Sequence, residues 1–171
     1  MDTERIIVPT SRPEVVLKQF IPEDAVLLFE LIDRNRAHLS QRGDETGKKY
    51  PSLVSVERSI THPPQPSRFR FGIWSDAPLT GSINLTPMTN AATYRDDLAE
   101  IGYWTGGEFC RQGFATLATT TLAEYALYTM GFIAVLARVH KKNRVSQRVL
   151  EYAGFYLEKI DDTLFYFARE E

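Results

Sequence analysis

The segment Gly106-Gly-Glu-Phe-Cys-Arg-Gln-Gly-Phe-Ala-Thr116 connects an expected strand at 98–105 to an expected helix at 116–130. Backbone N–H groups at a helix start have no partner within the helix, and the positive end of the helix dipole adds to them, so phosphate oxygens can bind there. Gly113 lets the backbone approach an anion, and Arg111 adds a charged donor. The alternative is a plain turn. The segment lacks the Gly-Lys-Ser/Thr of a nucleotide P-loop and the Gly-x-Gly-x-x-Gly of a dinucleotide site.

The segment Asn143-Arg-Val-Ser-Gln-Arg-Val-Leu-Glu-Tyr-Ala-Gly-Phe155 predicts a second helix over 143–153. Asn143 is a suitable N-cap, and Gly154 a suitable stop. Ser146 follows the cap by one turn and is expected at the edge of the buried face. That face is expected to carry Val145, Val149 and Tyr152. The alternative is that Asn143 is only a cap and Ser146 only a small packing residue.

The remaining pattern predicts a mixed α/β sheet with helices on its faces. Strands are expected over 15–20, 68–75, 79–86, 98–105, 132–139, 155–160 and 163–168. Helices are expected over 23–34, 116–130 and 143–153, with short helical turns at 36–39 and 55–60. Loops are expected over 44–49, 62–66 and 87–97. A chain of 171 residues is too short for two full cores with a linker, so we expect one domain over 1–171.

Composition excludes several classes of protein. Apolar residues make up 43% of the chain and charged residues 25%, which is a normal globular mixture and argues against disorder. No apolar run is long enough to span a bilayer, and the acidic opening does not resemble a secretory signal, so we expect no membrane association. A single cysteine, Cys110, excludes an internal disulfide framework and a cysteine-rich zinc site. We therefore expect a cytoplasmic protein.

The charge is distributed unevenly, although the net charge is only -2. Residues 138–148 carry five Lys or Arg residues and His140 but no acid. This run is either a solvated helix start or a docking place for a small phosphorylated ligand. Nucleic-acid binding is not expected, because the basic run is short and no nucleic-acid motif accompanies it.

These motifs together resemble the GNAT superfamily of N-acetyltransferases. Arg111-Gln-Gly-Phe-Ala-Thr116 is similar to its acyl-CoA pyrophosphate loop, and Asn143-x-x-Ser146 with Leu150-Glu-Tyr-Ala-Gly-Phe155 is similar to its next motif. Ile21-Pro-Glu-Asp-Ala25 and Ala99-Glu-Ile-Gly-Tyr-Trp104 resemble the RimJ/RimL-like branch, which includes ribosomal-protein N-terminal acetyltransferases. The resemblance covers about residues 13–168 and implies a mostly antiparallel sheet that splays apart between its fourth and fifth strands, at 98–105 and 132–139.

The resemblance also implies how acetyl-CoA, or another acyl-CoA, would bind. Backbone amides of the loop would hold the pyrophosphate, and strand 101–105 would pair with the pantetheine arm. Asn143 would bind the end of that arm, and Arg148 could meet the phosphates. The cofactor-binding residues expected on these grounds are Gly102, Tyr103, Trp104, Arg111, Gln112, Gly113, Phe114, Ala115, Thr116, Asn143 and Arg148.

In the implied reaction, a neutral amine attacks the thioester directly, a base accepts its proton and an acid protonates the thiolate. Glu100 is the candidate base, because it interrupts an apolar strand just before the splay, and Ser146 is the candidate donor to the thiolate. The alternative for Glu100 is an outward-facing strand residue. The sequence departs from the family at Leu150, where many relatives carry a tyrosine acid, and at Cys110, where Arg or Gln is usual. Tyr152 lies about 200° around the helix and should not substitute.

The sequence thus predicts an acyl-CoA-dependent N-acetyltransferase acting on a primary amine, either a peptide N-terminus or a small molecule. The alternative is an inactive acyl-CoA-binding sensor or structural module, for which Leu150 is the best support. No metal site is expected, because His38, His62 and His140 lack ligand spacing, and no histidine is placed as a base for Cys110. A homodimer is expected only by analogy with the family.

Overall fold

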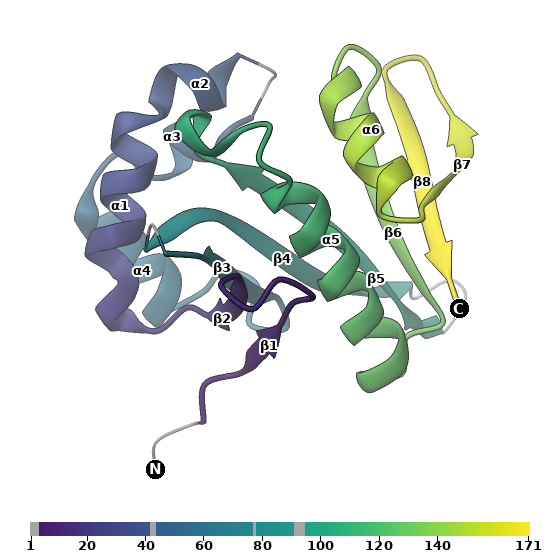
Figure 1. Ribbon diagram of the computed structural model, residues 1–171, viewed down its shortest axis with the longest axis horizontal. Helices are drawn as coiled ribbons and strands as arrows, with labels where there is room; N and C mark the ends of the chain where they lie inside the picture. The colour runs from purple at the N-terminus through teal and green to yellow at the C-terminus, as the bar shows by residue number, and fades with distance from the viewer. Residues whose placement is uncertain (1–3, 42–43, 77, 91–94) are drawn as a thin grey trace.

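One eight-stranded sheet in the order β1-β2-β3-β4-β5-β6-β8-β7 forms the centre of the molecule (Figure 1). The computed structural model describes residues 4–41, 44–76, 78–90 and 95–171. The strands are β1 (Ile7–Pro9), β2 (Val16–Gln19), β3 (Phe69–Trp74), β4 (Leu79–Asn90), β5 (Arg95–Thr105), β6 (Ala134–His140), β7 (Tyr156–Ile160) and β8 (Leu164–Glu170). All neighbouring strands are antiparallel except β5 and β6. The expected mixed, mostly antiparallel fold class is therefore confirmed.

Helices cover both faces of this sheet. They are α1 (Ala25–Arg34), α2 (Arg36–Ser40), α3 (Thr46–Lys49), α4 (Leu53–Thr61), α5 (Phe114–Glu124) and α6 (Arg144–Tyr152). One hydrophobic core lies between the sheet and α5 and α6, and a second includes α1 and α4. Adjacent strand residues serve opposite cores, as the period of two requires: Tyr103 packs on the first and Trp104 on the second. No helix within the described ranges is both long and apolar enough to cross a membrane.

The sheet forks between β5 and β6. β5 pairs with β4 as far as Thr105, but with β6 only over residues 98–100, which lie opposite 134–136. Beyond Glu100 the two strands diverge, toward the top of the view in Figure 1. The expected splay between these two strands is confirmed, and it leaves residues 101–105 without a strand partner on the side of β6.

Two expected loops are wrong. At 87–97, β4 continues to Asn90 and β5 begins at Arg95, because the long hairpin ladder extends through polar residues; residues 91–94 of that expected loop lie outside the described ranges. At 44–49, the short helix α3 forms, supported by Arg36, which donates to the carbonyls of Gly47 (2.7 Å) and Tyr50 (3.0 Å). Such distant contacts leave no local pattern.

Two smaller differences concern element bounds. β1 was not expected; it is three residues long and pairs with β2. The helix expected at 116–130 begins at Phe114 and ends in a π-helical turn, Tyr125–Thr129. The expected closing hairpin is present, and β8 lies between β6 and β7. The helix and strand propensities of the residues do not by themselves determine such a short strand or the exact ends of a helix.

The buried face of α6 also differs from expectation. Leu150 and Ala153 are buried, whereas Val145 and Tyr152 are 54% and 80% exposed. Both stripes of the helix carry apolar residues, so the sequence alone does not show which stripe packs against the core under α5. The exposure of Tyr152 agrees with the expectation that it cannot take the place of a tyrosine at 150.

Candidate active site

An open cleft of about 460 Å³ occupies the fork. Its walls come from β5, β6, α6 and the end of α2, so one space joins segments distant in sequence. Six predicted site residues line it: Gly102, Tyr103, Trp104, Ala115, Asn143 and Ser146. The other predicted residues are not among its lining residues: Glu100 is on β5, Arg148 is on α6, and the rest lie in the loop before α5 or in its first turn.

The β5 wall offers an unpaired strand edge. Residues 101–105 pair with β4 on one side only, because β6 has already diverged. An unpaired edge exposes backbone N–H and C=O groups that bind an extended, amide-containing chain. Gly102, on this stretch, adds no side chain, and a Cβ there would be in ordinary contact with the Asn84 side chain of β4 at 3.4 Å.

The loop before α5 turns its backbone through two left-handed residues. Arg111 has φ 62° and Gly113 φ 80°. Nothing lies within 4 Å of where a Cβ of Gly113 would be, so the space beside it is open. In the hydrogen bonds of the described residues, the N–H groups of 113–116 donate to no protein atom, and the first bond of α5 runs from Leu117 to Gly113. This helix start has the free donors and the space that an anion needs.

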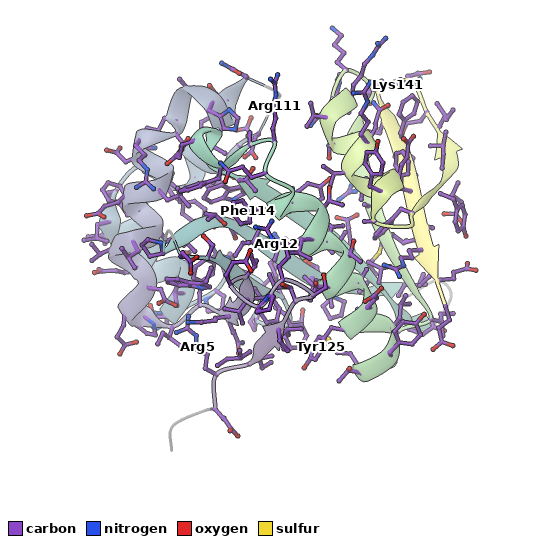
Figure 2. All side chains as sticks on the ribbon, in the orientation of Figure 1. Arg5, Arg12, Arg111, Phe114, Tyr125 and Lys141 are labelled. Atoms are coloured by element: carbon purple, nitrogen blue, oxygen red, sulfur yellow. The ribbon has the colours of Figure 1, made fainter. Side chains whose placement is uncertain are left out.

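Arg12 supports this loop from outside. Its Nη1 donates to the carbonyl of Gln112 at 3.1 Å, and its guanidinium lies 5.3 Å from the ring centre of Phe114. The C=O and N–H of a trans peptide point in opposite directions. By holding the Gln112 carbonyl, Arg12 therefore keeps the N–H of Gly113 directed to the other side. Figure 2 shows Arg12 lying close to Phe114, next to α5.

Basic side chains are exposed on the segments next to the cleft, outside its lining. Arg111, Lys142, Arg144 and Arg148 are exposed, and none of them forms an ion pair with another described residue. Figure 2 shows Arg111 and Lys141 projecting at the same end of the molecule, from the loop before α5 and the turn before α6. Their positive field favours a ligand that carries several phosphates.

The start of α6 places Asn143 and Ser146 together. Asn143 Oδ1 accepts from the backbone N–H of Ser146 at 3.1 Å, which is an N-cap. The cap predicted from the sequence is therefore present, and the Asn143 amide NH₂, which donates to no described residue, is left for a ligand in the cleft.

Tyr103 reaches Ser146 across the fork. The two hydroxyl oxygens are 2.7 Å apart, and Tyr103 Oη also lies 3.2 Å from the Ser146 carbonyl. Burial raises the pKa of the Tyr103 phenol to about 12, so this hydroxyl stays protonated across the physiological range. The sequence placed Tyr103 on the cofactor strand but gave no sign of this link.

Glu100 lies at the last pairing step of β5 with β6, and its carboxylate is engaged. Arg138 Nε and Nη2 donate to its two oxygens at 2.7 and 2.8 Å, and these bonds raise the pKa of Arg138. A carboxylate held on both oxygens must release one of them before it can accept a proton. Glu100 is not among the residues that line the cleft, and its role as base stays a prediction.

The structure brings His38 to Cys110, a pair that the sequence did not predict. His38 Nε2, from α2, lies 3.7 Å from Cys110 Sγ, and both residues line the cleft. The residues are 72 positions apart, so only the folded chain could reveal the pair. The described residues contain no group of three His, Cys, Asp or Glu side chains that could hold a metal ion.

A family model described as "Acetyltransferase (GNAT) domain" matches residues 14–156. No protein in a search of curated sequences matches the chain. The family match includes the loop before α5, the open edge of β5 and all of α6.

Solved structures of similar fold include acetyltransferases with different acceptors. RimL, a ribosomal L7/L12 alpha-N-protein acetyltransferase in complex with coenzyme A, has a TM-score of 0.81 at 17% identity, over 96% of this chain and 98% of that one. AAC(6')-Ib with ribostamycin and coenzyme A has 0.78 at 16%, over 92% and 93%. Mycobacterium smegmatis RimJ has 0.76 at 19%, over 97% and 86%. At these identities the likeness shows a shared fold.

Proposed function

The chain belongs to the GNAT acetyltransferase family, and we propose that it transfers an acetyl group from acetyl-CoA to a primary amine by direct attack in a ternary complex. One observation carries the proposal: the open edge of 101–105 lines a cleft that is also lined by Ala115, one of the four residues 113–116 whose amides are free. This combination suits a ligand that has a diphosphate at one end and an amide-containing arm at the other.

The proposed cofactor position follows from these surfaces. The amides of 113–116 and the Arg111 side chain would bind the pyrophosphate, and Phe114 contributes only its backbone because its side chain is 6% exposed. Residues 102–104 would pair with the pantetheine amides, and the Asn143 side chain would donate to the same arm. Arg148 stays the predicted contact to the remaining phosphates; it is exposed and lies outside the lining of the cleft.

The thioester would then lie in the fork between Glu100 and Ser146. An amine must lose a proton to attack, because amino groups with ordinary pKa values are largely protonated at pH 7. We assign proton acceptance to Glu100, directly or through water, with one oxygen released from Arg138. The Ser146 hydroxyl would donate to the departing thiolate.

The acceptor is a protein or peptide N-terminus, the substrate class named for RimL, or a small-molecule amine such as those bound by AAC(6')-Ib. The α2–α3 segment contributes His38, Leu39 and Asp44 to the cleft, so it is the part of the wall that would select between them. This segment carries acidic and basic residues, so its charge does not favour one acceptor class over the other. The experiment below distinguishes the two classes.

Calorimetric titration with acetyl-CoA, followed by a panel of peptides and amines scored by release of free thiol, tests the proposal. We expect saturable binding and thiol release with at least one acceptor class. Binding without release from any amine would instead support an acyl-CoA sensor. Glu100→Gln and Ser146→Ala should retain acetyl-CoA binding and lower kcat by more than about tenfold, and smaller losses would contradict the assigned roles.

A further inference from the structure

The hydroxyl pair of Tyr103 and Ser146 lies in the wall of the cleft, where the proposed reaction releases a thiolate. We infer that Tyr103 is a positioning residue that holds the Ser146 hydroxyl with its proton directed at the departing sulfur. This inference rests on the proposed function. It assigns a reaction role to a β5 side chain whose position suggested only cofactor contact.

The two residues approach from opposite sides of the fork. Tyr103 comes from β5 and packs against the core under α5, whereas Ser146 belongs to the first turn of α6. At position 150, one turn beyond Ser146, the helix carries a fully buried leucine. Tyr103 therefore supplies, from the facing strand, the phenol hydroxyl that α6 does not place beside Ser146.

The proton count decides what this contact can do. A tyrosine hydroxyl has one proton, and it can be given to Ser146 Oγ at 2.7 Å or to the Ser146 carbonyl at 3.2 Å. Donation to Oγ satisfies the serine oxygen and leaves the serine proton free to point into the cleft. Donation to the carbonyl would let the serine proton turn toward Tyr103 instead. Both arrangements keep the 2.7 Å contact, with donor and acceptor exchanged, and we assign the first, in which the serine proton remains available to the thiolate.

Tyr103 acts through Ser146 and is not itself the acid. Burial raises the pKa of its phenol to about 12, whereas a thiol has an ordinary pKa of about 8.5. Complete transfer of the phenolic proton to the thiolate would therefore be strongly unfavourable. Tyr103 keeps its proton and strengthens Ser146 as a donor, which is the behaviour of a neutral hydrogen-bond chain.

A double-mutant cycle of Tyr103→Phe and Ser146→Ala tests the inference. Tyr103→Phe should lower kcat roughly three- to tenfold, the effect of one neutral hydrogen bond, while KM for acetyl-CoA changes less than about twofold. In the Ser146→Ala background the same change should have no further effect, because the residue that it positions is absent. Tyr125→Phe is the matched control, since Tyr125, labelled in Figure 2, begins the π-helical turn after α5 and does not line the cleft.

A second measurement needs no acceptor. The pKa of the thiol of bound coenzyme A can be followed by the ultraviolet absorbance of the thiolate. Tyr103→Phe and Ser146→Ala should each raise that pKa, and the double variant should raise it no more than Ser146→Ala does. Calorimetry on each variant, together with circular dichroism, establishes that the folded protein still binds coenzyme A.

Each outcome is decisive. If the kcat losses of the two single variants multiply in the double variant, the inference is overturned, because Tyr103 would then act independently of Ser146. It is also overturned if Tyr103→Phe leaves kcat unchanged or raises only KM, because Tyr103 would then have no part in the chemical step. An unchanged thiol pKa in both single variants would do the same. If wild-type protein fails to bind coenzyme A, the proposed function itself is wrong, a result distinct from normal binding without coupling.

Discussion

At the scale of single residues, Arg12 controls the direction of a backbone amide that it does not touch. It bonds the Gln112 carbonyl on the outer side of the loop, so the N–H of Gly113 stays on the inner side, among the free donors of the helix start. The neighbouring left-handed Arg111 makes this loop unusual for a non-glycine backbone, and such a conformation needs support from its surroundings.

Replacing Arg12 should therefore weaken cofactor binding more than chemistry. Arg12→Ala should raise KM for acetyl-CoA about three- to tenfold, with kcat nearly unchanged, because the side chain is partly exposed and acts through one charged hydrogen bond. Steady-state kinetics measures both constants. Arg58→Ala, an exposed change on α4, is the control, and an equal KM for Arg12→Ala and wild type would refute the role.

Cys110 reports occupancy of the cleft. It is exposed, lines the cleft and is the single cysteine of the chain, so alkylation labels one known position. Acetyl-CoA at ten times its Kd should slow alkylation by iodoacetamide about tenfold, because only the free protein reacts and the thioester has no thiol to consume the reagent. Mass spectrometry follows the label, Cys110→Ser should not react, and an unprotected Cys110 would show that acetyl-CoA leaves this wall open.

Residues could be predicted from the sequence where the determining contacts are local. The Asn143 cap, the Gly113 turn and the free amides after it all follow from short motifs. The partners of Gln112, Glu100 and Cys110 could not be predicted, because they lie 100, 38 and 72 residues away. These distant partners determine the orientation and the hydrogen bonds of the residues that the local motifs identify.

At the scale of elements, the turn between β7 and β8 is organised by Asp161. Its carboxylate accepts from the Tyr166 hydroxyl and from the backbone N–H groups of Leu164 and Thr163, at 2.7, 2.7 and 2.9 Å. These bonds, the Tyr166 hydroxyl first, lower the pKa of Asp161 to about 2 from its ordinary 3.8. The folded hairpin thus favours the ionised carboxylate.

A lowered pKa in the folded state makes this contribution to stability acid-sensitive. It is fully present above the ordinary value and is lost as the pH falls from about 4 to 2. Asp161→Asn should lower the free energy of unfolding at pH 7 and should remove part of the decline between pH 4 and 2, as measured by urea unfolding. Asp162→Asn is the neighbouring control, and identical pH curves for Asp161→Asn and wild type would exclude the effect.

Elements were predicted well where caps and apolar periodicity agree, as in α1, α5 and α6. They were missed where tertiary contacts decide. The polar ends of β4 and β5 are strands because each is the other's partner, and α3 is supported by Arg36, which bonds the carbonyls of Gly47 and Tyr50. Neither cause leaves a pattern in the segment itself.

At the scale of the whole molecule, the cleft divides the sheet into five strands and three strands. A ligand that contacts both parts stabilises the folded protein by mass action. At a concentration 100 times its Kd, coenzyme A should add about 2.7 kcal/mol to the free energy of unfolding and raise Tm by roughly 5–11 °C. Calorimetric scanning checks this, and an unchanged Tm at saturating coenzyme A would contradict binding in the fork.

Three residue pairs at 98–100 join those two parts strand to strand, with the Glu100–Arg138 bridge beside them. The core under α5 spans the same joint, since it includes Ala99 of β5 and Val135 and Ala137 of β6. Rotating one part against the other would separate these buried side chains, so we expect the fork to keep its width in the free protein. An acyl-CoA would then enter a preorganised slot, and little of its binding free energy would be spent on ordering the protein.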